Sequence, residues 1–260
     1  EIKESYPDRM LIASIMAGAG SEEEMDNWRK LATSCVDVGC DALELNLSCP
    51  HMDRKDMGAH IANDEDIIRS ILAAVKSVVD VPIWVKLASA NSSLVNGAAA
   101  AYDAGAASIS LCNTFPSLPL LDPETMKFEV EVDGLVTSGG LGGLAILPQA
   151  LQHVSDIARA FPDKSISGIG GIKGFREAFN FIAHGAGNLQ VCTAAMEEKG
   201  SGGIGIKLIQ EMKDDLSDYM QRHGYSSIEE FRSVARDRVV KHSQIRRKSD
   251  TYNGGYAKLA

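Results

Sequence analysis

The sequence predicts an α/β fold in which parallel strands and helices alternate around a barrel. Short apolar runs rich in isoleucine and valine alternate with longer stretches of helical periodicity, which is typical of βαβ units around a parallel sheet. At three places a helical stretch stops on a glycine and a strand starts at once, at residues 37–42, 103–108 and 183–188. A glycine cap followed by a very short loop, repeated three times, indicates a barrel repeat.

Strands and helices are expected in alternating order along the chain. The runs that predict strands lie at residues 10–15, 42–47, 82–87, 108–111, 165–168 and 188–192. The runs that predict helices lie at residues 22–38, 64–79, 92–104, 145–161 and 174–184. We assign residues 1–215 to the barrel portion and residues 216–260 to a C-terminal helix and tail. In that segment Ser226 or Ser227 is the expected helix cap, with Glu229 or Glu230 close behind it.

Composition restricts the class of protein. A chain of 260 residues with 45% hydrophobic and 23% charged residues suits one large globular domain or two small ones. The net charge of -9 argues against nucleic acid as a partner, and we interpret the basic cluster Arg246-Arg247-Lys248 as a solvated tail. No apolar run approaches the roughly 20 residues of a membrane span, so a soluble protein is expected. Five cysteines without CxxC pairs argue against a disulfide framework or a metal site in this chain and favour a reducing, cytoplasmic compartment.

Polar residues gather just past the ends of the predicted strands. In a parallel barrel the βα loops converge on one rim, and the chemistry takes place there. The residues at these positions are Asn46 to Cys49, Lys86, Asn113, Thr114, Gly170, Gly171, Cys192 and Thr193. A single lysine here would be a solvated charge and a single Asn-Thr pair a turn, but five polar strand ends on one rim predict a site.

Two glycine-rich loops point to an anionic ligand. Residues 138–143 read SGGLGG and residues 168–172 read GIGGI, and each loop leads into a predicted helix. Missing β-carbons let backbone N–H groups approach a ligand, and a helix N-terminus favours anions. Either loop alone could be a tight turn. Together with Cys192 and Thr193 they favour phosphate binding, which a flavin-free barrel acting on a phosphosugar would also use.

In combination, these motifs resemble a known family. The stretches ELNLSCPH, WVKL, LCNT, SGGLGG, GIGGI and QVCTA, in this order and at these spacings, resemble the flavin-binding barrel of dihydropyrimidine dehydrogenase and, more distantly, dihydroorotate dehydrogenase. The resemblance covers about residues 1–230. It implies a TIM-type (β/α)8 barrel and an FMN-dependent oxidoreductase that reduces or oxidises a C=C or C–C bond conjugated to a carbonyl in a cyclic amide such as a pyrimidine.

The same resemblance implies a role for individual residues. Cys49 would be the general acid/base opposite the flavin. The substrate heterocycle would be held by Asn46, Leu47, Ser48, Asn113 and Thr114. FMN would be bound by Lys86, Gly143, Ile169, Gly170, Gly171, Cys192 and Thr193, and no metal site is expected.

The role of Cys49 also has a physical reason. Reduction of a C=C bond beside a carbonyl needs a hydride at one carbon and a proton at the other, from opposite sides if a flavin covers one face. A thiol on a loop can supply that proton, and the proline after Cys49 stiffens the loop. The alternative is a buried structural cysteine, which is how we interpret Cys35, Cys40 and Cys112.

Two departures from the family pattern leave alternatives open. The chain begins at what resembles the third barrel strand, and six strands cannot close an eight-stranded barrel. We therefore expect either a fragment of a longer polypeptide or completion by another chain. Gly20 stands about where the pyrimidine enzymes carry a substrate-binding asparagine. The alternatives are a dihydroorotate dehydrogenase or a non-catalytic relative serving as a subunit of a larger redox complex.

The expected partners follow from the same resemblance. They are a small cyclic-amide substrate and an electron-transfer partner chain or upstream domain, and we expect an oligomer. The segment after residue 230 contains no CxxCxxC run. Any FAD or iron–sulfur clusters are therefore expected upstream or on a partner chain.

Overall fold

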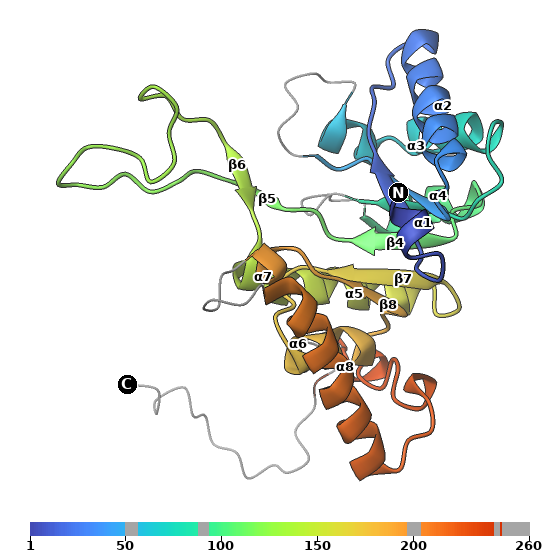
Figure 1. Ribbon diagram of the computed structural model, residues 1–260, viewed down its shortest axis with the longest axis vertical. Helices are drawn as coiled ribbons and strands as arrows, with labels where there is room; N and C mark the ends of the chain where they lie inside the picture. The colour runs from blue at the N-terminus through green and yellow to red at the C-terminus, as the bar shows by residue number, and fades with distance from the viewer. Residues whose placement is uncertain (50–56, 88–93, 197–203, 242–244, 246–260) are drawn as a thin grey trace.

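A six-stranded parallel sheet forms the centre of the computed structural model. The structure describes residues 1–49, 57–87, 94–196, 204–241 and 245, and only the backbone of 204–206. The strands are β1 (Ile12–Ile15), β2 (Ala42–Asn46), β3 (Ile83–Lys86), β4 (Ser108–Leu111), β7 (Ser165–Ile169) and β8 (Asn188–Gln190). They lie side by side in that order, with β1 and β8 at the two edges (Figure 1). The predicted α/β class, with parallel strands curled as in a (β/α) barrel, is confirmed.

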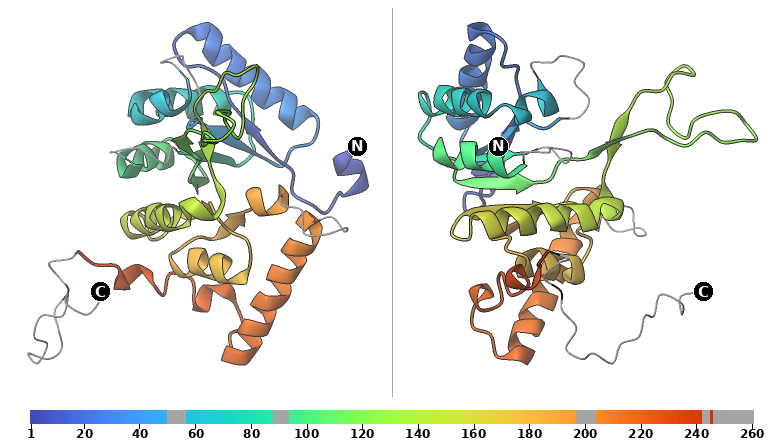
Figure 2. Two further views of the ribbon diagram at one scale, coloured as in Figure 1. Left: turned by 90° about the vertical axis from the view of Figure 1, so that its left-hand side faces the viewer. Right: turned by 180° about the vertical axis from the view of Figure 1, so that it is seen from behind.

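Helices that connect the strands cover one face of the sheet (Figure 2). They are α2 (Glu22–Asp37), α3 (Glu65–Lys76), α4 (Leu94–Asp103), α5 (Leu147–Ala160) and α6 (Phe175–Ala183). A short helix α1 (Ile2–Ser5) precedes β1, and α7 (Thr193–Met196) and α8 (Ile204–His223) follow β8. Short 3-10 turns lie at Gly58–Asn63, Gly143–Ile146, Ile228–Glu230 and Arg236–Arg238. The five predicted helices are all present, and the described part of each begins and ends within about three residues of the prediction.

Side-chain caps explain where two of these helices begin. Ser21 accepts a hydrogen bond from the Glu24 N–H at the start of α2, and Asp64 accepts two at the start of α3. The glycines predicted to end three helices have positive φ angles of 96° at Gly39, 90° at Gly105 and 119° at Gly185. The predicted glycine caps are therefore confirmed.

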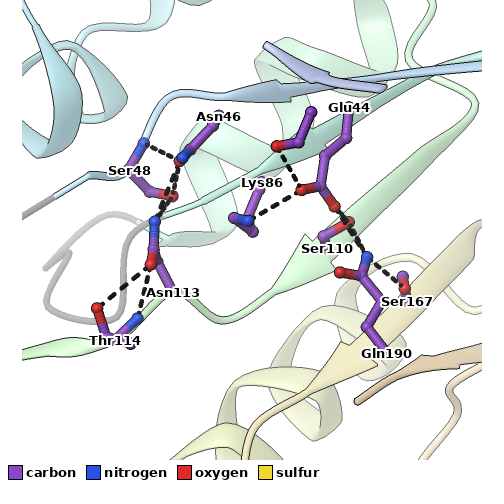
Figure 3. A network of polar contacts seen from close by, with 10 residues as sticks. Glu44, Asn46, Ser48, Lys86, Ser110, Asn113, Thr114, Ser167 and Gln190 are labelled. Atoms are coloured by element: carbon purple, nitrogen blue, oxygen red, sulfur yellow. Dashed lines mark hydrogen bonds and ion pairs between the residues drawn. The ribbon is translucent and has the colours of Figure 1, made fainter. Parts of the chain in front are cut away.

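Alternate residues of the strands have opposite environments. Leu43, Leu45, Val85 and Ile109 are fully buried in the hydrophobic core that the helices complete. Residues that alternate with them, among them Glu44, Lys86 and Ser110, carry polar side chains on the other side of the sheet (Figure 3). Because side chains alternate with a period of two, the sheet has one apolar face against the helices and one polar face toward the barrel interior.

An antiparallel hairpin departs from the predicted architecture. Strands β5 (Phe115–Ser117) and β6 (Gly139–Leu141) pair with each other and extend away from the sheet (Figure 1). The sequence prediction treated residues 138–143 as one glycine loop, but Gly139–Leu141 form a strand and only the following glycines enter a helical turn. Residues 118–138 at the outer end carry exposed apolar side chains, among them Leu120, Met126 and Leu135.

The C-terminal segment packs against α6 through aromatic side chains. Phe231 is buried and stacks on Phe179, with ring centroids 5.7 Å apart, and Tyr219 of α8 meets both rings. The Ser233 N–H donates to the carbonyl of Ile182 at the end of α6. These contacts replace the amphipathic helix expected after residue 225 with two 3-10 turns, although the predicted capping pair, Ser227 and Glu230, is present.

The boundary between residues 215 and 216 stays a prediction, and α8 runs continuously across it. Among the residues that the structure describes, no helix is long and apolar enough to cross a bilayer.

Candidate active site

A cavity of about 340 Å³ opens at the carboxyl ends of the strands. Its volume lies within the range of small-molecule sites, roughly 300–1,000 Å³. It is lined by Lys86, Cys112, Asn113, Thr114, Gly142, Gly143, Leu144, Ile146, Ile169, Gly170, Gly171, Ile172, Lys173, Gln190, Cys192, Thr193 and Ala194. All seven residues assigned to the cofactor therefore lie around one cavity, together with two of the five assigned to substrate.

Three loops meet at one end of this cavity with no space for extra side chains. A β-carbon on Gly171, whose φ is 77°, would lie 2.9 Å from the Gly143 carbonyl oxygen and 2.9 Å from Leu147 Cβ. A β-carbon on Gly143 would lie 3.2 Å from Thr193 Cγ2. The loop after β7 thus packs on the backbone of the loop after β6, and the Thr193 side chain after β8 packs on Gly143. Backbone amides of glycine-rich loops and the Thr193 hydroxyl suit the chemistry of a phosphate group.

A buried carboxylate lies below the cavity and holds its lysine. Glu44 is only 4% exposed, and its Oε1 accepts a hydrogen bond from Lys86 Nζ at 2.9 Å (Figure 3). Burial raises the pKa of the Glu44 carboxyl and is the largest single effect on it. The charge of Lys86 and the hydrogen bonds from Gln190, Lys86 and Ser110 together outweigh burial, so the pKa lies below the ordinary glutamate value. The Glu44 carboxylate is therefore ionised at neutral pH.

Amide and hydroxyl groups form a second cluster, of which Asn113 and Thr114 line the cavity. Asn113 Nδ2 donates to Asn46 Oδ1 at 3.1 Å and to Ser48 Oγ at 2.9 Å (Figure 3). Asn113 Oδ1 accepts from the backbone N–H of Thr114 at 2.8 Å. Side-chain amides both donate and accept, which suits the edge of a flat cyclic amide. Four of the five predicted substrate residues are thus brought together, although the sequence separates them widely.

The remaining predicted residues lie around these groups. Cys49 follows Ser48 beyond the end of β2, is partly exposed and accepts a backbone hydrogen bond from Ala59 through its carbonyl. It is not among the residues that line the cavity, and residues 50–56 after it lie outside the described structure. Leu47 is fully buried in the core, so its side chain faces away from the site. Gly20 is exposed in the loop after β1.

Sequence reasoning missed several residues of the site. Cys112 lines the cavity in addition to being buried, and burial raises the pKa of its thiol to about 12, so it stays protonated. Glu44, Ser110, Ser167 and Gln190 were not singled out either. The signal was present, because polar residues recur at every second position of buried strands in 108–110 and 165–167. In the part of the chain that the structure describes, no group of three or more His, Cys, Asp or Glu side chains is placed to hold a metal ion.

Comparison with known proteins identifies the family. The dihydroorotate dehydrogenase family model matches residues 2–220. The chain is 32% identical over 250 residues to dihydropyrimidine dehydrogenase (NADP(+)) of Arabidopsis thaliana, covering 94% of this chain and 56% of that protein. It is 32% identical over 242 residues to the NAD-dependent dihydropyrimidine dehydrogenase subunit PreA of Escherichia coli K12, covering 92% and 56%.

A third relative has a different named activity. The chain is 34% identical over 230 residues to the catalytic subunit of dihydroorotate dehydrogenase B (NAD(+)) of Methanothermobacter thermautotrophicus, covering 87% of this chain and 69% of that protein. The chain thus spans a little over half the length of its dihydropyrimidine dehydrogenase relatives. By the family model and by these relatives, the chain belongs to the dihydroorotate dehydrogenase family.

Proposed function

We propose that this chain forms the FMN-binding catalytic portion of an oxidoreductase that acts on CH–CH groups in a cyclic amide, in the manner of dihydropyrimidine dehydrogenase. The observation that carries the proposal is the continuity of one cavity. The glycine cradle, Lys86, and Asn113 with its amide cluster all belong to the wall of this cavity. A phosphorylated flavin and a flat substrate need these three features together.

The described residues fit FMN. A β-carbon on Gly143 or Gly171 would press on the neighbouring loop, so glycine at these positions lets the loops come together around a phosphate. Gly143, Gly170, Gly171 and Thr193 would hold the phosphate and the ribityl end. Lys86 would face the ring and ribityl chain, with Ile169 and Cys192 beside it. When bound, FMN supplies hydride transfer.

The residues of the chain would orient the substrate and move its proton. Asn46, Ser48, Asn113 and Thr114 would hold the amide edge of the heterocycle through paired donors and acceptors. Cys49 would transfer a proton between its Sγ and the ring carbon on the face opposite the flavin. In the reducing direction the thiol gives up the proton, and the thiolate regains one from solvent before the next turnover. Leu47 would contribute only through its backbone.

Several expectations about the whole protein remain part of this proposal. The relative PreA is named as a subunit, which supports an electron-transfer partner chain or upstream domain for this protein. FAD and iron–sulfur clusters, a cytoplasmic location and an oligomeric assembly are further expectations. Dihydroorotate dehydrogenase is the second candidate activity, because the same amide cluster would serve an orotate ring and the relative of dihydroorotate dehydrogenase B is 34% identical.

Cofactor analysis of the complete protein tests the proposal. The protein is purified without added cofactor, denatured, and the released flavin identified by chromatography as FMN or FAD. The reduced protein is then mixed anaerobically with uracil, thymine or orotate. We expect FMN bound to this chain and reoxidation by a cyclic amide. A protein that neither retains nor rebinds FMN, or whose reduced flavin no cyclic amide reoxidises, would contradict the proposal, and orotate alone would favour the second candidate.

A further inference from the structure

One polar side chain from each of the six parallel strands joins a single network (Figure 3). Its members, in strand order, are Ser14, Glu44, Lys86, Ser110, Ser167 and Gln190. The interior of a (β/α) barrel is ordinarily filled by layers of branched apolar side chains. A polar layer with a buried carboxylate at its centre is therefore a feature that packing does not require.

Glu44 makes four of the contacts in this network. Its Oε1 accepts from Lys86 at 2.9 Å and from Ser14 at 3.1 Å. Its Oε2 accepts from Ser110 at 2.8 Å and from Gln190 at 2.8 Å. Gln190 Nε2 also lies 3.0 Å from Ser167 Oγ. The carboxylate is thus fully satisfied, which is the condition under which a buried charge persists.

The position of Glu44 relative to the cavity decides how it can act. Glu44 does not line the cavity, but Lys86 and Gln190, the two side chains that it holds, both do. Its carboxylate fixes the Lys86 ammonium on the cavity wall and, among the described residues, is the carboxylate that forms an ion pair with it. Glu44 can therefore affect a molecule in the cavity through the side chains that it holds or through its charge, but not by direct contact.

We propose that Glu44 is a positioning residue that fixes Lys86 at the flavin and partly neutralises its charge, so that it lowers the preference of the site for reduced over oxidised flavin. This inference rests on the proposed function. Two-electron reduction makes the flavin ring system more electron-rich and more readily anionic, so a nearby cation favours the reduced form. The carboxylate behind Lys86 opposes that effect.

The alternative is that Glu44 only ties the strands together. A purely structural role would affect the stability of the fold and the affinity for both flavin forms alike. A role through the charge of Lys86 would change the ratio of the two affinities. The ratio is therefore the quantity to measure.

Glu44→Gln is the informative substitution because the network can adapt to it. The new amide oxygen can accept from Lys86, and the new amide nitrogen can donate to Ser110. Gln190 can rotate its side-chain amide so that its oxygen faces the new amide nitrogen at position 44. Glu44→Asp keeps the charge with a shorter side chain and serves as the matched control.

The experiment uses the complete protein and measures dissociation constants of oxidised and reduced FMN by flavin fluorescence and absorbance under anaerobic conditions. We expect Glu44→Gln to favour reduced FMN about tenfold more than the parent does, which corresponds to a rise of about 30 mV in the two-electron potential. Glu44→Asp should stay within about twofold of the parent ratio. If the parent and Glu44→Gln have the same ratio of dissociation constants for oxidised and reduced FMN, the proposal is overturned. If Glu44→Gln and Glu44→Asp change this ratio equally, the effect comes from disturbed packing and the proposal is likewise overturned.

A double-mutant cycle tests whether Glu44 acts through its lysine. If it does, adding Glu44→Gln to Lys86→Met should change the ratio by less than about twofold. The double variant leaves neither charge without a partner, and in Lys86→Met alone the Glu44 carboxylate keeps its hydrogen bonds from Ser14, Ser110 and Gln190. A tenfold change within the pair would overturn the proposal. A parent protein that binds no FMN would overturn the proposed function and this inference with it, whereas FMN binding without the expected ratios would overturn this inference alone.

Discussion

A β-carbon on Gly171 would lie 2.9 Å from the carbonyl oxygen of Gly143, so these two glycines bring the loops after β7 and β6 into direct backbone contact. A side chain at Gly171 would displace the loop of Gly143, and a side chain at Gly143 would press on Thr193 Cγ2 at 3.2 Å. The cradle of the cavity therefore depends on two residues far apart in the sequence, and a change at either one is expected to alter ligand binding before it alters the fold.

Gly171→Asp should abolish FMN retention and leave most of the fold intact. The substitution adds a side chain where the backbone of Gly143 already lies, at a positive φ of 77°, and adds negative charge where a phosphate would bind. Flavin absorbance after purification and the circular dichroism spectrum measure the two effects. Gly139→Asp is the matched control, because a β-carbon there meets nothing within 4 Å. Full flavin occupancy in Gly171→Asp would contradict the cradle assignment.

Asn113→Ala should weaken catalysis much more than flavin binding. It removes the donor to Asn46 and Ser48 and leaves both groups without that partner. A lost hydrogen bond in such a site costs about 1–3 kcal/mol, or roughly five- to 150-fold in kcat/KM. Steady-state kinetics with the best cyclic amide would measure this. Asn63→Ala, which removes an exposed local hydrogen bond to Ala59, should leave kcat/KM unchanged. A similar loss in both variants would exclude a specific role for Asn113.

Glu44 should make the stability of the fold depend on acid pH. Its pKa is lowered in the folded state, so its stabilisation is fully present above the unfolded value of about 4.3 and is lost as the pH falls through the folded value. The difference in unfolding free energy between the parent and Glu44→Gln should be constant from pH 7 to about 5 and should decrease below about pH 4. Chemical denaturation across this range would measure it. A difference that grows in acid would show that the sign of the pKa shift is wrong.

Local sequence signals were sufficient for most of the fold. Gly39, Gly105 and Gly185 end helices as predicted. A glycine cap depends on the local backbone conformation and not on contacts with distant segments. Residues that follow strands, such as Lys86 and Thr193, could be assigned to one rim because parallel strands place their carboxyl ends together. Those signals are local or follow from topology.

The elements that the sequence did not predict depend on contacts between distant segments. The stretch around Phe231 has helical periodicity, but burial of that ring against α6 and the bond from Ser233 hold it in 3-10 turns. The β5–β6 hairpin was hidden by its glycines, which also fit a loop. The α8 pattern in residues 204–223 is amphipathic and could have been recognised.

The Glu44 network needed strand register as well as sequence. Periodicity can assign Glu44 and the serines of β4 and β7 to one face. That Glu44 meets Lys86 and Gln190 depends on how neighbouring strands are staggered, which no single strand specifies.

The most direct test of the account is the rate at which a cyclic amide reoxidises the reduced flavin of the complete protein in a single turnover, compared between the parent and Cys49→Ala. Single-turnover mode isolates the chemical step from product release. Cys35→Ala, a change at a partly buried cysteine that packs on the core, is the control and should leave the rate nearly unaltered. If Cys49 is the general acid, Cys49→Ala should keep its flavin and lose about two to four orders of magnitude in rate. Reoxidation of Cys49→Ala as fast as the parent would show that the cysteine is structural and that the proposed mechanism is wrong.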